Sequence, residues 1–170
     1  AIVNSCRRYS PVTNFMYSTP PFSGNRALHG QIGLADGRVL VVGGANGDVL
    51  TQNFFSLATC EIYNEPTNSW SNVSNIPEAR SFPSLIEAAG RVHVLSGVGT
   101  IDLTTLSGTP VTNIASGDIT TFNWASAGTM VLPRALSASI AIEGGQRIVT
   151  LGPGDNGTTS ADLTAEIYIP

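Results

Sequence analysis

The 170-residue chain contains no lysine and carries little charge of either sign. Charged residues make up 12% of it, with 8 arginines against 12 acidic residues and a formal net charge of −4. So few cations leave no positive surface that could collect phosphates, which argues against nucleic acid as a partner. The absence of lysine and the scarcity of glutamate also argue against a helical bundle or a coiled coil.

Long hydrophobic runs are absent as well. No apolar stretch approaches 18 residues, so the sequence predicts no membrane span. The longest runs, such as Val39–Val42, have the length of a strand. Hydrophobic residues nevertheless make up 42% of the chain, which argues against intrinsic disorder. Because the chain starts at Ala1 without a hydrophobic leader, we expect a processed product or a piece of a longer chain.

Short uncharged polar residues and turn formers take the place of the missing charges. The chain has 46 Ser, Thr and Asn residues, 18 Gly and 10 Pro. This composition indicates a turn-rich, all-β protein, and together with the lack of lysine it predicts an extracellular or secreted location. Asn72 and Asn156 each begin an N-x-Ser/Thr sequon. Two sequons are expected by chance in such a chain, so glycosylation at either site stays open.

A repeat of about 54 residues runs through the sequence. Arg26, Arg80 and Arg134 are spaced 54 and 54 apart, and Trp70 and Trp124 are also 54 apart. Tyr9 and Tyr63 match in the same way, as do Cys6 and Cys60. After each outer Arg comes a second matched phrase, beginning at Asp36, Ala89 and Gly145. So many matched columns at one spacing predict a structural repeat.

Each repeat has the pattern of short antiparallel strands. A half-buried stretch over 27–34 is followed by an Asp-Gly turn and by Arg38–Val42, a run without polar interruption that is typical of a buried strand. Gly43-Gly44 ends this run, where we expect a positive φ or a close approach of the backbone. A variable loop, a strand over 58–63 and a strand around Trp70 complete four strands, which predicts a propeller blade.

The Gly-Arg-Val-Leu-Val-Val-Gly-Gly run, the Tyr seven residues before Trp70 and the Pro-x-Ala-Arg segment resemble kelch repeats. The resemblance covers nearly the whole chain and is strongest between Arg26 and Arg80. It implies an all-β fold, a kelch-like β-propeller of six or seven four-stranded blades. Kelch propellers include binding scaffolds, sugar-acid isomerases and the central domain of copper radical oxidases, so the resemblance implies no single function.

The chain is therefore expected to be a single propeller segment of about three blades. Residues 1–25 would end one blade, 26–79 and 80–133 would form two complete blades, and 134–170 would form a partial one. Three blades do not close a ring. Further blades would come from identical chains or from the rest of a longer chain.

The repeat arginines Arg26, Arg80 and Arg134 are candidate ligand-binding residues. Each lies where the outer strand returns to the innermost one, so three guanidinium groups could grip an anionic ligand. The alternative is structural: each Arg would bond carbonyl or acidic groups of the neighbouring blade. The recurrence of the position favours this alternative.

His29 and His93 are the only histidines, and His29 is a candidate for lining the channel or for binding a ligand. No further ligands at a fixed spacing accompany either residue, so the sequence predicts no metal and no cofactor. Copper radical oxidases need a Tyr–Cys crosslink and histidine ligands, which this pattern lacks. Cys6 and Cys60 occupy equivalent strands of adjacent blades, beyond bridging distance, so we expect no bond between them within one chain. A bond between chains is the alternative.

Asp48, Asp102 and Asp155 follow the second strand of successive repeats and are further candidates for binding a ligand. They could contact calcium or sugar hydroxyl groups, or they could cap their own turns. Trp70, Trp124, Tyr63 and Tyr9 could form a sugar-stacking surface, but their repeat spacing favours packing between blades. No catalytic constellation is evident.

These observations favour a non-enzymatic extracellular module for binding or structural interaction. A protein or glycan ligand would meet the loops at one rim of the propeller. One alternative is part of a carbohydrate-active enzyme, similar to galactose oxidase or to sugar-acid isomerases, whose catalytic residues lie outside this chain. Another is a self-assembling structural protein that pairs through open blade edges.

Overall fold

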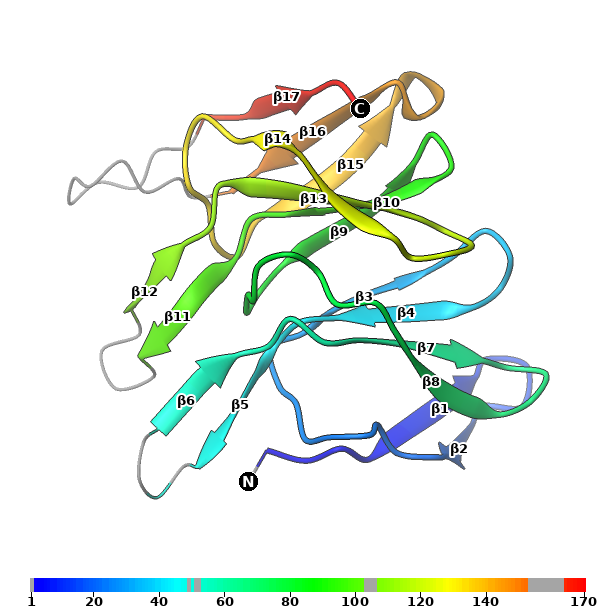
Figure 1. Ribbon diagram of the computed structural model, residues 1–170. Coiled ribbons are helices and arrows are strands. Elements are labelled where there is room, and N and C mark those ends of the chain that lie inside the picture. The colour runs from blue at the N-terminus through cyan, green and yellow to red at the C-terminus, as the bar shows by residue number, and fades with distance from the viewer. Residues whose placement is uncertain (1, 49, 51–52, 103–106, 153–163) are drawn as a thin grey trace.

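The computed structural model describes residues 2–48, 50, 53–102, 107–152 and 164–170 (Figure 1). Its regular structure is almost entirely antiparallel β-sheet, which confirms the all-β class predicted from the sequence. Among these residues no helix is long and apolar enough to cross a membrane.

Four sheets follow one another along the chain, and within each the strands lie side by side in chain order. The first sheet pairs β1 (Cys6–Ser10) with β2 (Phe15–Thr19). The second contains β3 (Gly30–Gly33), β4 (Val39–Val42), β7 (Cys60–Asn64) and β8 (Ser69–Val73). The third contains β9 (Ser84–Ala88), β10 (Arg91–Leu95), β13 (Asn113–Asp118) and β14 (Trp124–Thr129). The fourth contains β15 (Ala138–Ile142), the 3₁₀ turn η1 (Glu143–Gly145), β16 (Arg147–Leu151) and β17 (Glu166–Tyr168).

The segment after the second strand of a repeat is a β-hairpin, so the expectation of a variable loop there was wrong. In the second repeat it consists of β5 (Ala45–Asp48) and β6 (Asn53–Ser56). In the third it consists of β11 (Val98–Asp102) and β12 (Ser107–Pro110). Backbone pairs Ala27–Ala45 and Ser81–Val98 fix the base of each hairpin to the segment that precedes the first strand of its repeat. Both hairpins project from the same side of the molecule (Figure 1).

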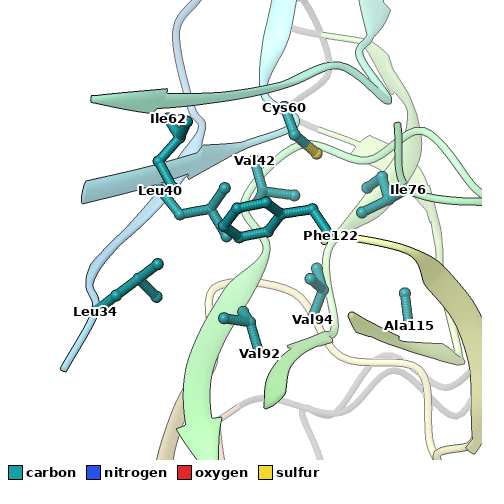
Figure 2. Packing of buried hydrophobic residues seen from close by; sticks show 10 residues of the cluster. All are labelled: Leu34, Leu40, Val42, Cys60, Ile62, Ile76, Val92, Val94, Ala115 and Phe122. Atoms are coloured by element: carbon teal, nitrogen blue, oxygen red, sulfur yellow. The ribbon is translucent and has the colours of Figure 1, made fainter. Parts of the chain in front are cut away.

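The hydrophobic core lies between successive sheets. Leu40 and Val42 of β4 belong to the same buried cluster as Val92 and Val94 of β10 and Phe122, as Figure 2 shows. A second cluster joins the third and fourth sheets. Because side chains of a strand point alternately to its two faces, the third sheet contributes to both clusters.

Glycines allow the chain to turn from the second strand of a repeat into its hairpin. Gly44 and Gly97 have φ values of +103° and +102°. A Cβ atom at Gly44 would lie 2.5 Å from the carbonyl oxygen of Ala27, and at Gly97 it would lie 2.6 Å from that of Ser81. The expected positive φ and close backbone approach at the double glycine are therefore confirmed.

Candidate functional site

The three repeat arginines are buried, with 5%, 0% and 0% of Arg26, Arg80 and Arg134 exposed. The Nη1 group of Arg26 donates to the carbonyl oxygen of Gly43 at 2.9 Å. Its Nη2 group donates to Glu61 Oε1 at 2.6 Å, and the Glu61 side chain is buried as well. Arg26 thus ties the end of β4 to the third strand of its own sheet.

Arg80 and Arg134 repeat this arrangement with different partners. Arg80 Nη1 donates to the carbonyl oxygens of Ser96 at 3.2 Å and Asn113 at 2.8 Å. Burial lowers the pKa of Arg80 to about 10, and the nearby Glu78 carboxylate opposes this shift. Arg134 donates from Nε to Glu166 Oε1 at 3.1 Å and from Nη1 to the carbonyl of Gly152.

These hydrogen-bond partners belong to the repeat that the arginine begins, but Arg80 Nε also donates to the carbonyl oxygen of Glu78 at 3.4 Å, and Glu78 ends the preceding repeat. The structural alternative from the sequence, with bonds to a neighbouring unit, is therefore wrong for Arg26 and Arg134 and holds in part for Arg80. The spacing of the repeat could not reveal these partners, because the β5–β6 hairpin separates Glu61 from Arg26 in the sequence. A ligand-binding role for the three arginines stays a prediction, and any ligand would have to displace internal hydrogen bonds to reach them.

His29 borders a cavity of about 370 Å³ between the first and second sheets. Its ring packs edge-on against Phe22, with 5.5 Å between the ring centroids, and Phe22 packs in turn against Trp70 at 4.6 Å. Tyr63, on the strand beside Trp70, completes an aromatic wall. Burial lowers the pKa of His29, and the charge of Arg26 lowers it further, so the imidazole is neutral at pH 7.

Three buried polar atoms around this cavity have no hydrogen-bond partner among the described residues. They are Thr19 Oγ1, His29 Nδ1 and Trp70 Nε1, and all three residues line the cavity. Unpaired buried polar groups are costly, so a group that bonded these three atoms would gain free energy on binding. The Tyr63–Trp70 spacing pointed to this wall, but Thr19 and Phe22 gave no signal in the sequence.

Two of the three aspartate candidates, Asp48 and Asp102, lie at the hairpins. Asp48 ends β5 and is exposed, and its Oδ1 accepts a hydrogen bond from the backbone of Leu50 at 2.8 Å. Asp102 ends β11 and is also exposed. Asp155 lies outside the described residues. The two hairpins lie against each other through β6 and β11, and the Ser56 hydroxyl donates to the carbonyl of Val98 at 3.0 Å.

One face of the β5–β6 hairpin combines an aromatic ring with polar side chains. The register pairs Asn46 with Phe55 and Asp48 with Asn53. Phe55 is 51% exposed, and Asp48 and Asn53 are exposed beside it. The sequence did not single out Phe55, because the repeat places no aromatic residue at the matching position of the next unit.

Metal and thiol chemistry have little support in the described part of the chain. No group of three or more His, Cys, Asp or Glu side chains there could hold a metal ion. Cys6 and Cys60 are both free. Burial raises the pKa of the Cys60 thiol to about 11, so it stays protonated and unreactive.

Comparisons with known proteins show a likeness of fold. No protein-family model matches the chain. No curated protein matches it either. Among solved structures, the chain is similar to that of YjhT, with a TM-score of 0.67 at 18% sequence identity. The match covers 92% of this chain and 55% of that one, so the chain spans about half the length of this structural relative.

Proposed function

We propose that the chain is a segment of a kelch-like β-propeller that binds a glycan at the rim formed by its hairpins. The successive four-stranded sheets, the repeat spacing and the structural likeness to YjhT support the propeller. In this arrangement β3, β9 and β15 are innermost, and the β5–β6 and β11–β12 hairpins stand on one rim. The polar, lysine-free composition supports an extracellular location, and the lack of a catalytic constellation in the sequence pattern is the basis for proposing a binding module.

The exposed face of the β5–β6 hairpin is the observation that carries the binding role. Phe55 offers a flat apolar ring, against which the C–H face of a sugar can stack. Asp48 and Asn53 lie next to it and offer acceptors and donors for hydroxyl groups. An aromatic ring flanked by a carboxylate and an amide suits a neutral sugar better than an anionic ligand, because the rim is acidic.

An array of immobilised neutral oligosaccharides tests this proposal. Wild-type protein should bind a subset of these sugars, and Phe55→Ala should weaken binding about tenfold, equivalent to ~1.4 kcal/mol. Asp48→Asn should weaken it less, because the amide keeps an acceptor. Phe15→Ala is the matched control, because Phe15 is an exposed phenylalanine on β2 of the first sheet.

Failure of the wild-type protein to bind any of the sugars would refute the glycan ligand and favour a protein partner. Equal losses in Phe55→Ala and Phe15→Ala would show that the β5–β6 face is not the binding surface.

A further inference from the structure

Each sheet turns one face to the next sheet along the chain, here called its forward face, and the other to the preceding sheet, its backward face. Leu40 and Val42 lie on the forward face of the second sheet and pack with Val92 of the third. Leu95 lies on the forward face of the third sheet and packs with Ile148 of the fourth. In both cases the forward face is buried by a backward face of the next repeat.

The forward face of the fourth sheet is apolar but exposed. Ile140, Val149 and Ile167 form one row across β15, β16 and β17 by their register. Ile140 and Ile167 are 55% and 60% exposed, and Leu151 on the same face is 51% exposed. Val149 occupies the strand position that Leu40 has in the second sheet, and Leu40 is fully buried there. No described residue covers this row.

The backward face of the second sheet borders a cavity, whereas the forward face of the fourth sheet carries exposed apolar side chains. In the third sheet the matching backward face is covered by the second sheet. Leu85 on β9 lies so close to Gly30 of β3 that a Cβ atom on Gly30 would be 2.7 Å from Leu85 Cδ1. Gln31 occupies the position of Leu85 in the second sheet, and it lines the cavity instead, together with Val39. The cavity, with its unpaired polar atoms, thus lies where a preceding pair of inner strands would pack.

We propose that a second copy of this chain occupies these surfaces. The forward face of the fourth sheet of each copy packs on the backward face of the second sheet of the other, so β15 and β16 fill the cavity beside β3 and β4. Two such contacts are equivalent by a two-fold axis and close a ring. The inference rests on the propeller fold proposed above.

Two copies agree with the length of the structural relative and with the strand order at the contact. One chain matches 55% of YjhT, so two copies slightly exceed that length. The excess length corresponds to one surplus strand at each contact between the copies. Both β1 of one copy and β17 of the other match the third strand of a sheet, and only one of them can take that position. Buried Arg134 bonds Glu166 of β17, whereas β1 has Arg7 where the second sheet has Glu61. Because a second arginine there would repel Arg134, β17 keeps the place and the β1–β2 hairpin moves outward.

Light scattering coupled to size-exclusion chromatography tests the pairing over a dilution series of the full chain. Wild-type protein should have the mass of two chains. The double variant Ile140→Glu/Ile167→Glu should have the mass of one chain at every concentration at which the wild-type protein is paired. Ile140→Thr/Ile167→Thr keeps β-branched side chains and should shift pairing in the same direction. Val12→Glu is the control, because Val12 is 93% exposed in the turn after β1, away from both faces.

A wild-type mass of one chain throughout would overturn the proposal. So would a paired wild type that both isoleucine variants leave unchanged, or a mass that grows beyond two chains, which indicates an open assembly. Circular dichroism identifies any variant that fails to fold, and the threonine variant then decides. Sugar binding at Phe55 is measured separately, so failure of pairing and failure of the rim proposal are distinguishable.

Discussion

Each repeat arginine is buried, and most hydrogen bonds of its guanidinium group go to neutral oxygen atoms. Arg80 is the extreme case, because its Nη1 group bonds two backbone carbonyls and its acidic neighbour Glu78 is half exposed. Arg26 instead meets the buried carboxylate of Glu61. The recurring element is therefore the bond to the strand-end carbonyl, while the acidic partner varies.

Replacement of Arg80 by alanine should lower the free energy of unfolding by about 3 kcal/mol, because two buried carbonyls lose their donor and a cavity remains. Urea denaturation followed by tryptophan fluorescence measures this. Arg7→Ala is the control: Arg7 is exposed on β1, and its loss should change stability by less than about 0.5 kcal/mol. Equal effects of the two changes would contradict a structural role for Arg80.

His93 is a buried neutral base in the contact between the third and fourth sheets. It is 1% exposed, and its ring packs on Tyr168 with 5.6 Å between centroids. Burial lowers the pKa of His93, the charge of Arg91 lowers it further, and the Ala88 backbone opposes the shift. At the matching position the second sheet has the apolar Leu40. The stability of the contact between the third and fourth sheets should therefore depend on pH through His93.

Stability should therefore fall as the pH drops below the ordinary histidine pKa of about 6.5. In this range the unfolded chain binds a proton that folded His93 does not, and the loss ends once the pH passes the lower folded pKa. Urea midpoints measured from pH 8 to pH 4.5 should fall less steeply in His93→Leu than in the wild-type protein. The double variant with His29→Leu should be flatter still. Parallel curves for His93→Leu and the wild type would be evidence against this account.

At the scale of elements, hydrophobic runs and glycines predicted the strands of the sheets, but not the hairpins between them. The run at β4 is apolar throughout and its strand was evident, whereas β5 is Ala-Asn-Gly-Asp and lacks any hydrophobic pattern. Its strand forms by pairing with β6, and the backbone pair of Ala45 with Ala27 holds the base of this hairpin in place. Such a long-range backbone contact has no signal in local sequence.

Residues other than glycine with a left-handed backbone conformation were equally difficult to predict from the sequence. Leu28, Phe82 and Leu136 have φ values of +57°, +55° and +54°, each two residues after a repeat arginine. Leucine and phenylalanine do not favour this conformation, so only the spacing could have pointed to it. The candidate site was predictable to a similar extent: the arginine columns were found, but not the residues that bond them or the cavity beside His29.

The glycine that begins the β11–β12 hairpin should tolerate no side chain. Gly97→Ala would place a Cβ against the Ser81 carbonyl at a positive φ, and should cost about 2 kcal/mol or more of unfolding free energy. Gly33→Ala in β3 is the control, because open space surrounds Gly33 and the change should stay within about 0.5 kcal/mol. Chemical denaturation of both variants gives the comparison. A Gly97→Ala protein as stable as Gly33→Ala would show that the junction can relax.

At the scale of the whole molecule, neutral hydroxyl groups help to join the repeats. Ser56 and Ser81 lie 2.8 Å apart across the second and third repeats, and Ser96 and Ser137 lie 2.7 Å apart across the third and fourth. Ser84 bonds Ser139 at 2.9 Å in the same contact. These short side chains fit between closely packed strands, and they join the repeats without using charged groups.

The burial of the repeat arginines also determines where trypsin can cut the folded protein. The enzyme needs an accessible lysine or arginine, and this chain has no lysine and keeps Arg26, Arg80 and Arg134 inside. Limited digestion should therefore begin at Arg7 and Arg8 near one end and at Arg147 near the other, where the side chains are exposed. Arg38 and Arg91 are partly exposed and should be cut next, whereas mass spectrometry should detect cleavage after Arg26, Arg80 or Arg134 only once the protein unfolds. Early cleavage after Arg80 would contradict this. The burial of these three arginines thus also protects the start of each repeat from digestion.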